Sequence, residues 1–171
     1  MQMLFQNLDE HGYVEQHVCF EGPYIMKGLF FTHLTSLQLL RYFPHMLIVD
    51  CTYKTNRFKY PLLEIVGVTS TSMTFIAVHA FLAKEKMSDY EWALRQLREL
   101  LVRWTRPGVI LTGRDQALIR AVEEVFPSCT HLLCGWHVNK NVHARTRELF
   151  SNQEDYDIWY GRWMDVVHAS T

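Results

Sequence analysis

The hydrophobic positions of this chain fall mainly into short extended runs up to Leu82 and take a helical period from Ser88 onward. Apolar and β-branched runs at residues 46–49, 60–69 and 73–82 are separated by polar turn residues. Such runs are typical of β-strands, and short connections favour antiparallel neighbours. The pattern therefore predicts three adjacent antiparallel strands in the first half of the chain.

Two more extended runs precede these strands, at residues 12–19 and 24–31, around the turn residues 21–23. Glycine and proline in that turn favour a β-hairpin. After the hairpin, Thr35 or Ser36 is placed to cap a short helix that ends before the next strand. The start of the chain is thus predicted to be a hairpin followed by a helix.

The helical period begins at a Ser88-Asp89-Tyr90-Glu91 segment, which has the form of a capping box. Behind it, apolar residues recur at helical spacing as far as Trp104. Shorter patterns then predict a strand at residues 109–112, a helix that follows Asp115 and is closed by Pro127, a strand at 130–134, and two final helices at 136–150 and 156–167. Strands alternating with helices indicate an α/β fold, a mixed sheet covered by helices.

Composition narrows the class of protein without changing this fold. A length of 171 residues suits one domain that needs no disulfides, and 20% charged residues is ordinary for a globular protein. The sequence has no run of apolar residues long enough for a membrane helix, and no signal peptide pattern, so an intracellular protein is expected. Four scattered cysteines favour reduced thiols. A net charge of −1 means that any DNA-binding surface must be local.

The strand at residues 46–49 delivers a carboxylate, Asp50, to its polar end. An acid at a strand tip can bind a metal or a substrate, or can simply end the strand. Lys54, Arg57 and Lys59 follow it and form a small basic cluster that suits phosphate or a solvated loop equally well. Glu64 lies within the next apolar strand and must be either exposed or paired, because an unpaired buried carboxylate is costly.

Cysteine and histidine gather between Cys129 and His143, and such ligands suit zinc. Strand alternation puts Cys129 and His131 on one face and Cys134 on the other, so they cannot all bind one metal. Cys134 and His137 remain as a pair, and two ligands do not make a structural zinc site. A buried thiol beside a hydrogen-bonded histidine is the alternative.

Taken together and in order, several motifs resemble the Mutator-like element (MULE) transposase domain over roughly residues 25–145. The segments that carry this resemblance are 50–56, 61–62, 90–94, 117–127 and the Leu-Leu-Cys-Gly-Trp-His-Val-Asn-Lys-Asn run at 132–141. The resemblance implies a ribonuclease-H-like fold of the DDE superfamily, in which two Asp and one Glu hold two Mg²⁺ or Mn²⁺ ions for DNA cleavage and joining. It also implies that the partner is DNA, namely transposon ends, and that the protein is nuclear. A homo-oligomer is one option.

In this alignment of motifs, residues 1–44 lead into the core, 45–134 form the ribonuclease-H-like core, and 135–171 begin a helical insertion in which the chain ends. Asp50 matches the first catalytic acid, and Cys134 with His137 matches the family Cys-x-x-His motif. Lys54, Arg57, Lys59 and Arg114 are the candidates for contact with DNA.

The second acid is where the chain departs from the family. Its usual Thr-Asp pair reads Thr112-Gly113 here, and glycine has no ligand atom. Asp115 is a candidate substitute, although its position at a helix start favours N-capping. The third acid is expected beyond Thr171. The resemblance therefore predicts a transposase-derived domain with impaired catalysis, and the alternatives are a domesticated module that binds DNA or protein without catalysis, or an unselected gene fragment.

Overall fold

The structure is a computed structural model that describes residues 2–20, 25–52, 56–101 and 106–169. The chain divides into two compact units, Met1–Leu133 and Cys134–Thr171, and each is described by itself. The predicted basic residue Lys54 lies outside the described residues. No helix among the described residues is both long and apolar enough to cross a membrane.

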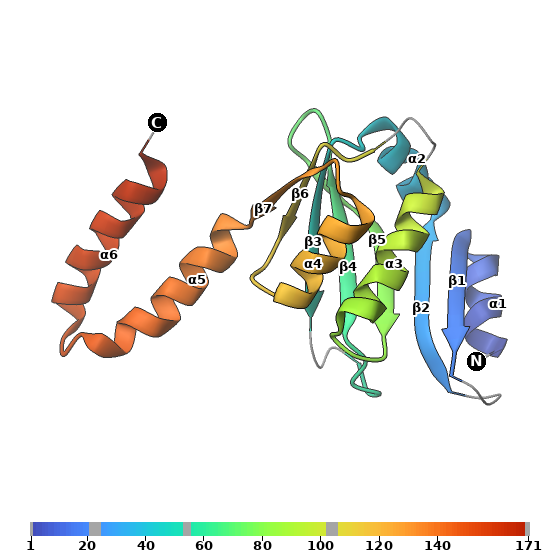
Figure 1. Cartoon of the computed structure of the whole chain (residues 1–171), viewed down its shortest axis with the longest axis horizontal. Coiled ribbons are helices and arrows are strands. Elements are labelled where there is room, and N and C mark those ends of the chain that lie inside the picture. Colours follow the sequence, from blue (N-terminus) through green and yellow to red (C-terminus); the bar gives the residue numbers. More distant parts are fainter. Residues whose placement is uncertain (1, 21–24, 53–55, 102–105, 170–171) are drawn as a thin grey trace. The chain divides into compact units, whose positions relative to one another are not determined.

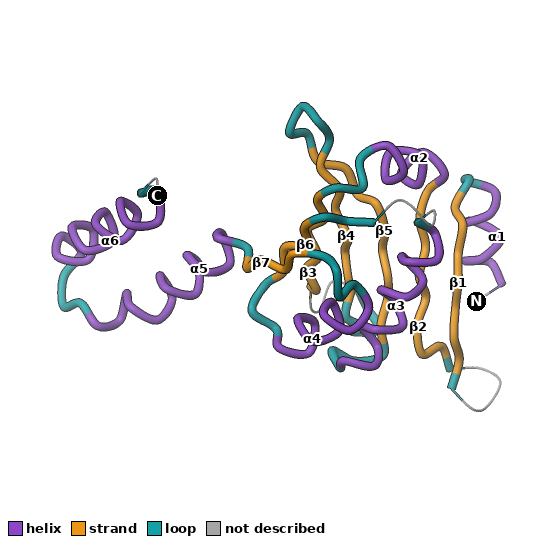
Figure 2. The backbone as a smooth tube through the Cα atoms, turned by 45° about the horizontal axis from the view of Figure 1, so that its top comes forward, coloured by secondary structure: helices purple, strands orange, loops and turns teal. Residues whose placement is uncertain are grey.

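The first unit is a seven-stranded mixed sheet with helices, as Figures 1 and 2 show. Its sheet has the strand order β1-β2-β5-β4-β3-β6-β7. The elements in chain order are α1 (Gln2–Glu10), β1 (Tyr13–Cys19), β2 (Met26–His33), α2 (Leu34–Tyr42), β3 (Met46–Thr52), β4 (Leu62–Val68), β5 (Thr74–Leu82), α3 (Met87–Leu100), β6 (Val109–Thr112), α4 (Gln116–Val125) and β7 (Thr130–Leu133).

Strand direction follows from how the strands are connected. The β3, β4 and β5 strands pair antiparallel, as the sequence predicts, because short connections join them. At the β4–β5 turn, the backbone N–H of Ser72 donates to the carbonyl of Thr69. The β6 and β7 strands lie parallel to β3 because α3 and α4 provide the crossovers that parallel pairing requires. The prediction of a mixed α/β fold is confirmed.

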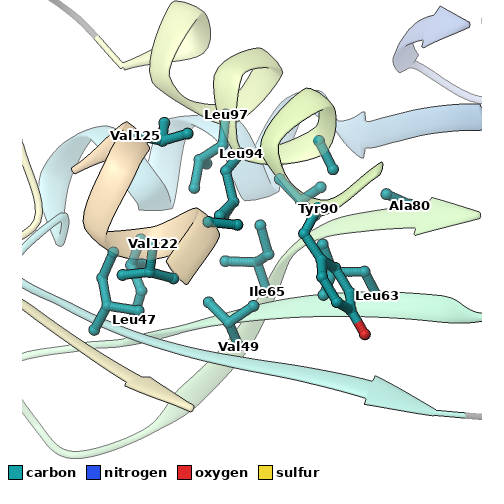
Figure 3. Packing of buried hydrophobic residues seen from close by; sticks show 14 of the residues in the cluster. Leu47, Val49, Leu63, Ile65, Ala80, Tyr90, Leu94, Leu97, Val122 and Val125 are labelled. Atoms are coloured by element: carbon teal, nitrogen blue, oxygen red, sulfur yellow. The ribbon is translucent and has the colours of Figure 1, made fainter. Parts of the chain in front are cut away.

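The main core lies between the sheet and helices α3 and α4, which lie side by side over one face (Figures 1 and 3). We call this face the helix-covered face. Alternate residues of β3 and β4 point into it and are fully buried: Leu47, Val49, Leu63 and Ile65. Figure 3 shows them beneath the apolar side chains of both helices, namely Tyr90, Leu94, Leu97, Val122 and Val125. The apolar residues that alternate along the strands and those that recur at helical spacing are thus buried together in one core.

The opposite face, here called the second face, carries the other set of alternating residues. Helix α1 lies against its β1 edge, where the Phe5 ring stacks on His17 at 4.7 Å. Next to α1, Leu29 of β2 is buried on this face, outside the main core. Farther along the sheet, Asp50, Glu64 and His79 are half-buried.

Three helix starts differ from the sequence-based predictions. The α3 helix begins at Met87 after the N-cap Lys86, so Ser88 lies inside the first turn and forms no capping box. The α2 helix is capped by His33, whose Nδ1 accepts from the N–H of Thr35 at 3.1 Å, rather than by Thr35 or Ser36. The α1 helix was not predicted. It has no acidic residue in its first turn and no basic residue in its last, and its packing on β1 stabilises it.

The second unit consists of α5 (Gly135–Thr146), a short 3₁₀ helix η1 (Arg147–Leu149) and α6 (Gln153–His168). Asn152 caps α6 by accepting from the N–H of Asp155 at 2.8 Å. The indole N–H of Trp163 donates to Asn139 Oδ1 at 2.9 Å and so joins the two long helices. Aromatic rings pack around the buried Tyr156, including His143, Phe150 and Tyr160.

Candidate functional site

The site predicted from the sequence centres on Asp50 in β3. Parallel pairing of β3 with β6 sets Val49 opposite Thr112, so the next residues along the two strands, Asp50 and Gly113, are neighbours. Val49 and Thr112 both point into the helix-covered face and are fully buried. Because side chains alternate along strands, Asp50 belongs to the second face, and Gly113 is the first residue after β6. The tertiary structure thus brings Asp50 beside a position that has no side chain.

Thr112 shows how the end of β6 is held. Its hydroxyl donates to the carbonyl of Gly113 at 2.8 Å and lies 2.8 Å from Nε2 of His131 in β7. The Thr112 side chain is fully buried, so these bonds satisfy a polar group that would otherwise be costly. His131 therefore acts as a hydrogen-bonding partner of Thr112.

Next to Asp50 on the second face is a row of polar residues that crosses the antiparallel strands. Asp50 pairs with Glu64 of β4, and Glu64 pairs with His79 of β5. Nδ1 of His79 lies 3.4 Å from Oε1 of Glu64. The sequence predicted that Glu64 is either exposed or paired. In the structure it is partly exposed and also contacts His79. Sequence reasoning missed His79, because only the strand register places it beside Glu64.

Asp115 has other partners. Its Oδ1 accepts from the N–H of Ala117 at 2.8 Å and from the N–H of Leu118, so Asp115 is the N-cap of α4. Its Oδ2 accepts from the phenol of Tyr90 at 2.8 Å. Tyr90 projects from α3 toward the sheet on the helix-covered face (Figure 3). The structure therefore ties Asp115 to the two covering helices, whereas Asp50 belongs to the second face.

Tyr90 also contacts the residue that follows Asp50. Burial raises the pKa of the Cys51 thiol to about 12, a hydrogen bond with Tyr90 lowers it, and the nearby Glu85 carboxylate raises it further. Burial, followed by the influence of Cys51 and Asp115, raises the pKa of Tyr90. Both groups stay protonated at neutral pH. Sequence reasoning placed Tyr90 on the apolar face of a helix but had no signal for its polar contacts.

The basic candidates lie on exposed turns. Arg57, Lys59 and Arg114 are exposed. The guanidinium carbon of Arg57 lies 4.5 Å from the centre of the Phe58 ring. Lys59 has a left-handed backbone with φ of 59°. These three residues are available to a polyanion, with Arg57 and Lys59 on the same turn.

Cys134 and His137 belong to the second unit. Cys134 is the N-cap residue of α5, and His137 lies in the first turn of that helix, where Asn141 Nδ2 donates to its carbonyl at 2.8 Å. The four cysteines are free thiols, and burial raises the pKa of Cys129. Among residues 2–20, 25–52, 56–101 and 106–169, no group of three or more His, Cys, Asp or Glu side chains can hold a metal ion.

The described side chains around Asp50 do not fit the two-metal centre that the sequence resemblance implies. Two hard divalent ions need several carboxylate oxygens at one point. Here Asp50 has the Glu64 carboxylate beside it on β4, whereas Gly113 offers no ligand after β6, and Asp115 is engaged by α4 and Tyr90. Among the described residues, the acid that the resemblance implies at position 113 is therefore missing.

Comparison with known proteins agrees with the motifs. Residues 46–141, more than half of the chain, match the MULE transposase domain. This range contains Asp50, Gly113, Cys134 and His137. The chain belongs to the MULE transposase domain family, which confirms the resemblance seen in the sequence.

Similar curated proteins come from a plant and a fungus. The chain is 28% identical over 138 residues to the Arabidopsis thaliana protein FAR-RED IMPAIRED RESPONSE 1, covering 80% of this chain and 16% of that protein. It is 24% identical over 143 residues to FAR1-RELATED SEQUENCE 5 of the same plant, covering 83% of this chain and 18% of that protein. It is 28% identical over 118 residues to a PKS-NRPS hybrid synthetase of Chaetomium globosum, covering 68% of this chain and 2% of that protein. The chain thus spans less than a fifth of each of these relatives.

Proposed function

We propose that this chain is a ribonuclease-H-like, transposase-derived domain that associates with DNA and has impaired strand-transfer chemistry. Its family membership supports the transposase origin. Three antiparallel strands, β5, β4 and β3, continue into the parallel strands β6 and β7, and this mixed sheet supports a ribonuclease-H-like fold. Action on transposon-like DNA would place the protein in the nucleus.

One observation carries the proposal of impaired catalysis. The β3–β6 register makes position 113 the neighbour of Asp50, and position 113 is glycine. Two metals need a carboxylate from each strand to be held in place for phosphoryl transfer. With Asp115 held by α4 and Tyr90, its recruitment would cost a helix cap and a partly buried hydrogen bond. DNA association without catalysis is therefore the function that the site favours.

The association with DNA is proposed to depend on Arg57, Lys59 and Arg114. The net charge of −1 gives no general attraction to a polyanion, so affinity must come from these local cations. Each phosphate contact releases condensed counterions, so binding should weaken steeply as salt rises. A protein-binding module that does not bind DNA is the second candidate, and the absence of net positive charge favours it.

Restoring the missing acid tests the impaired site. We expect Gly113→Asp to bind Mn²⁺ more tightly than the unmodified chain, because a carboxylate after β6 then adds to that of Asp50 in β3. Isothermal titration measures this change. The variant Gly113→Asn is the matched control, since it has the same shape without the charge, and the double variant Asp50→Asn/Gly113→Asp should lose the gain.

A cleavage assay tests whether the unmodified chain has catalytic activity. The unmodified chain is expected to leave a supercoiled plasmid and a labelled duplex intact in Mg²⁺ or Mn²⁺. Cleavage by the unmodified chain that disappears in Asp50→Ala would contradict impaired catalysis. Absence of binding to any DNA at low salt would instead contradict the association with DNA and favour the protein-binding module.

A further inference from the structure

A cavity of about 690 Å³ lies within the first unit. Its walls come from Met3 and Leu4 of α1, Ile25 before β2, and Phe58 and Tyr60 between β3 and β4. Phe81 of β5 also lines it. The volume falls in the range of about 300–1,000 Å³ that is typical of small-molecule sites. None of the residues assigned to metal binding or catalysis lines this cavity.

The aromatic side chains of the cavity are held before any ligand binds. The Tyr60 phenol donates to the carbonyl of Met26 at 2.8 Å. Phe81 lies in the sheet, where it pairs with Leu62 and Leu29, and its ring centre is 6.0 Å from that of Phe31. A preformed pocket loses less conformational entropy on binding than a pocket that must form around its ligand.

The turn that carries Phe58 and Tyr60 is fixed by Asn56. Oδ1 of Asn56 accepts from the N–H groups of Phe58 and Tyr60, at 3.1 and 3.2 Å. Nδ2 of the same side chain donates to the carbonyl of Tyr60 at 2.6 Å. The amide of Asn56 is thus used to hold the turn, and Phe58 remains 66% exposed at the cavity. An exposed phenylalanine on a fixed turn is available for stacking.

The chemistry of the lining favours a flat apolar group attached to an anion. Among the described residues that line the cavity, Arg57 is the charged one and none is a carboxylate. Its guanidinium carbon lies over the Phe58 ring, 4.5 Å from the ring centre, so the cation is held beside the aromatic ring. Nucleobases stack on aromatic rings, and their phosphates bind arginine. A nucleotide of a single strand combines these two properties.

The cavity is also placed close to the candidate site. Phe81 pairs with Leu62, which pairs with Thr52 of β3, two residues beyond Asp50. Phe81 is two residues after His79 in β5, so both side chains lie on the second face, together with Asp50 and Glu64. Two strand spacings and two residue rises amount to about 12 Å between the backbones of Phe81 and Asp50. A DNA strand that reaches Asp50 can therefore reach the cavity.

The geometry points to this cavity as a binding pocket for one unpaired base of a DNA strand, with Arg57 on the adjoining phosphate. This inference rests on the DNA association of the proposed function and not on its catalytic part. An unpaired base must leave its stack, so strand ends and distorted duplexes are the preferred ligands.

Two oligonucleotides with equal charge test the inference. One is a labelled oligothymidylate of about twelve nucleotides, within the range of single-strand sites, and the other replaces every base by an abasic residue. Because their phosphates are the same, the electrostatic attraction is the same. The unmodified chain should bind the oligothymidylate more tightly by fluorescence anisotropy. Phe58→Ala should weaken that binding about tenfold and leave the abasic affinity unchanged.

Matched variants separate the pocket from general effects. Tyr42→Ala removes an aromatic ring that is 77% exposed elsewhere in the same unit and should change neither affinity. Arg57→Gln should weaken both oligonucleotides, and Arg120→Gln, an exposed arginine on α4, should have less effect. Thermal unfolding of each variant checks that it folds.

The outcomes distinguish the inference from the proposed function. Equal affinity for the two oligonucleotides, or an equal loss in Phe58→Ala and Tyr42→Ala, overturns the base pocket and leaves DNA association intact. No binding to either oligonucleotide at low salt overturns both. If an apolar dye that fluoresces in the cavity stays bound when the oligothymidylate saturates the protein, the cavity takes an apolar partner instead of a base.

Discussion

The two faces of the sheet in the first unit differ although the same strands form both. In β4, Leu63 is fully buried under α3 and α4, while its neighbour Glu64 lies on the second face beside His79. In β3, Val49 is buried and Asp50 is half-buried. The helix-covered face holds most of the buried apolar area, and the second face holds the acids and the aromatic cavity.

This difference separates stability from function within single strands. Packing against two helices makes the covered face intolerant of changes in volume. The second face can accept substitutions at polar positions, because solvent and neighbouring side chains still satisfy them. Polar residues of the second face can therefore vary while the fold persists.

The largest effect is expected from shortening a side chain of the covered face. Leu63→Ala should lower the free energy of unfolding by about 2–5 kcal/mol, because it removes buried contacts and leaves a cavity. Denaturant unfolding measures the change. A loss of less than 1 kcal/mol, on the order of an exposed substitution, would show that the covered face is not the main core.

A smaller loss is expected where α3 approaches β2. A Cβ atom on Gly28 would lie 2.6 Å from Cζ3 of Trp92, so Gly28→Ala must displace the ring and should cost about 1–3 kcal/mol. Gly161→Ala in α6 is the control, since its Cβ would have no atom within 4 Å, and alanine favours the helix. Shortening Trp92 in the Gly28→Ala background should recover part of the loss.

The contact between Tyr90 and Asp115 tests the polar part of the covered face. Tyr90→Phe removes the phenol that donates to Asp115 and should cost about 0.5–1.5 kcal/mol. Asp115→Ala should cost more, because the N-cap of α4 is lost as well. If the two variants were equally stable, the cap would contribute nothing.

The Cys51 thiol predicts how stability changes at alkaline pH. Its pKa is about 12 in the folded chain and 9.0 ordinarily, so the folded state holds the proton more tightly. The corresponding stability is complete below pH 9 and falls as the pH rises toward 12. Thermal unfolding from pH 8 to 11 should show a shallower decline for Cys51→Ala. The exposed Cys19 should react first with a thiol reagent.

The smallest effect is expected on the second face. Glu64→Gln alters the contact with His79, and because both side chains are about 30% exposed, the change should be within about 1 kcal/mol. The same unfolding experiment on Glu64→Gln and Leu63→Ala compares how much two adjacent residues, one on each face, contribute to the free energy of unfolding. A loss as large as that of Leu63→Ala would mean that the row of polar residues stabilises the fold.

Much of the fold was predictable because it depends on local patterns. Alternation in β3 and β4 predicts which residues are buried, and helical spacing predicts α3 and α4. Asp115 was predicted as an N-cap, and the structure confirms this role. The predicted N-caps of α2 and α3 were wrong. For α3, Ser88 has the neighbours of a capping box, but the N-cap residue is Lys86.

By itself, the sequence determined the α/β order of elements, the family motifs and the glycine at position 113. Only the tertiary structure decided that this glycine is the neighbour of Asp50, that Asp115 is held by Tyr90, and that Phe58, Tyr60 and Phe81 share a cavity with α1. The physical reason is the range of the interactions. Periods and caps arise between residues a few positions apart, whereas strand register and cavities join residues that only folding brings together.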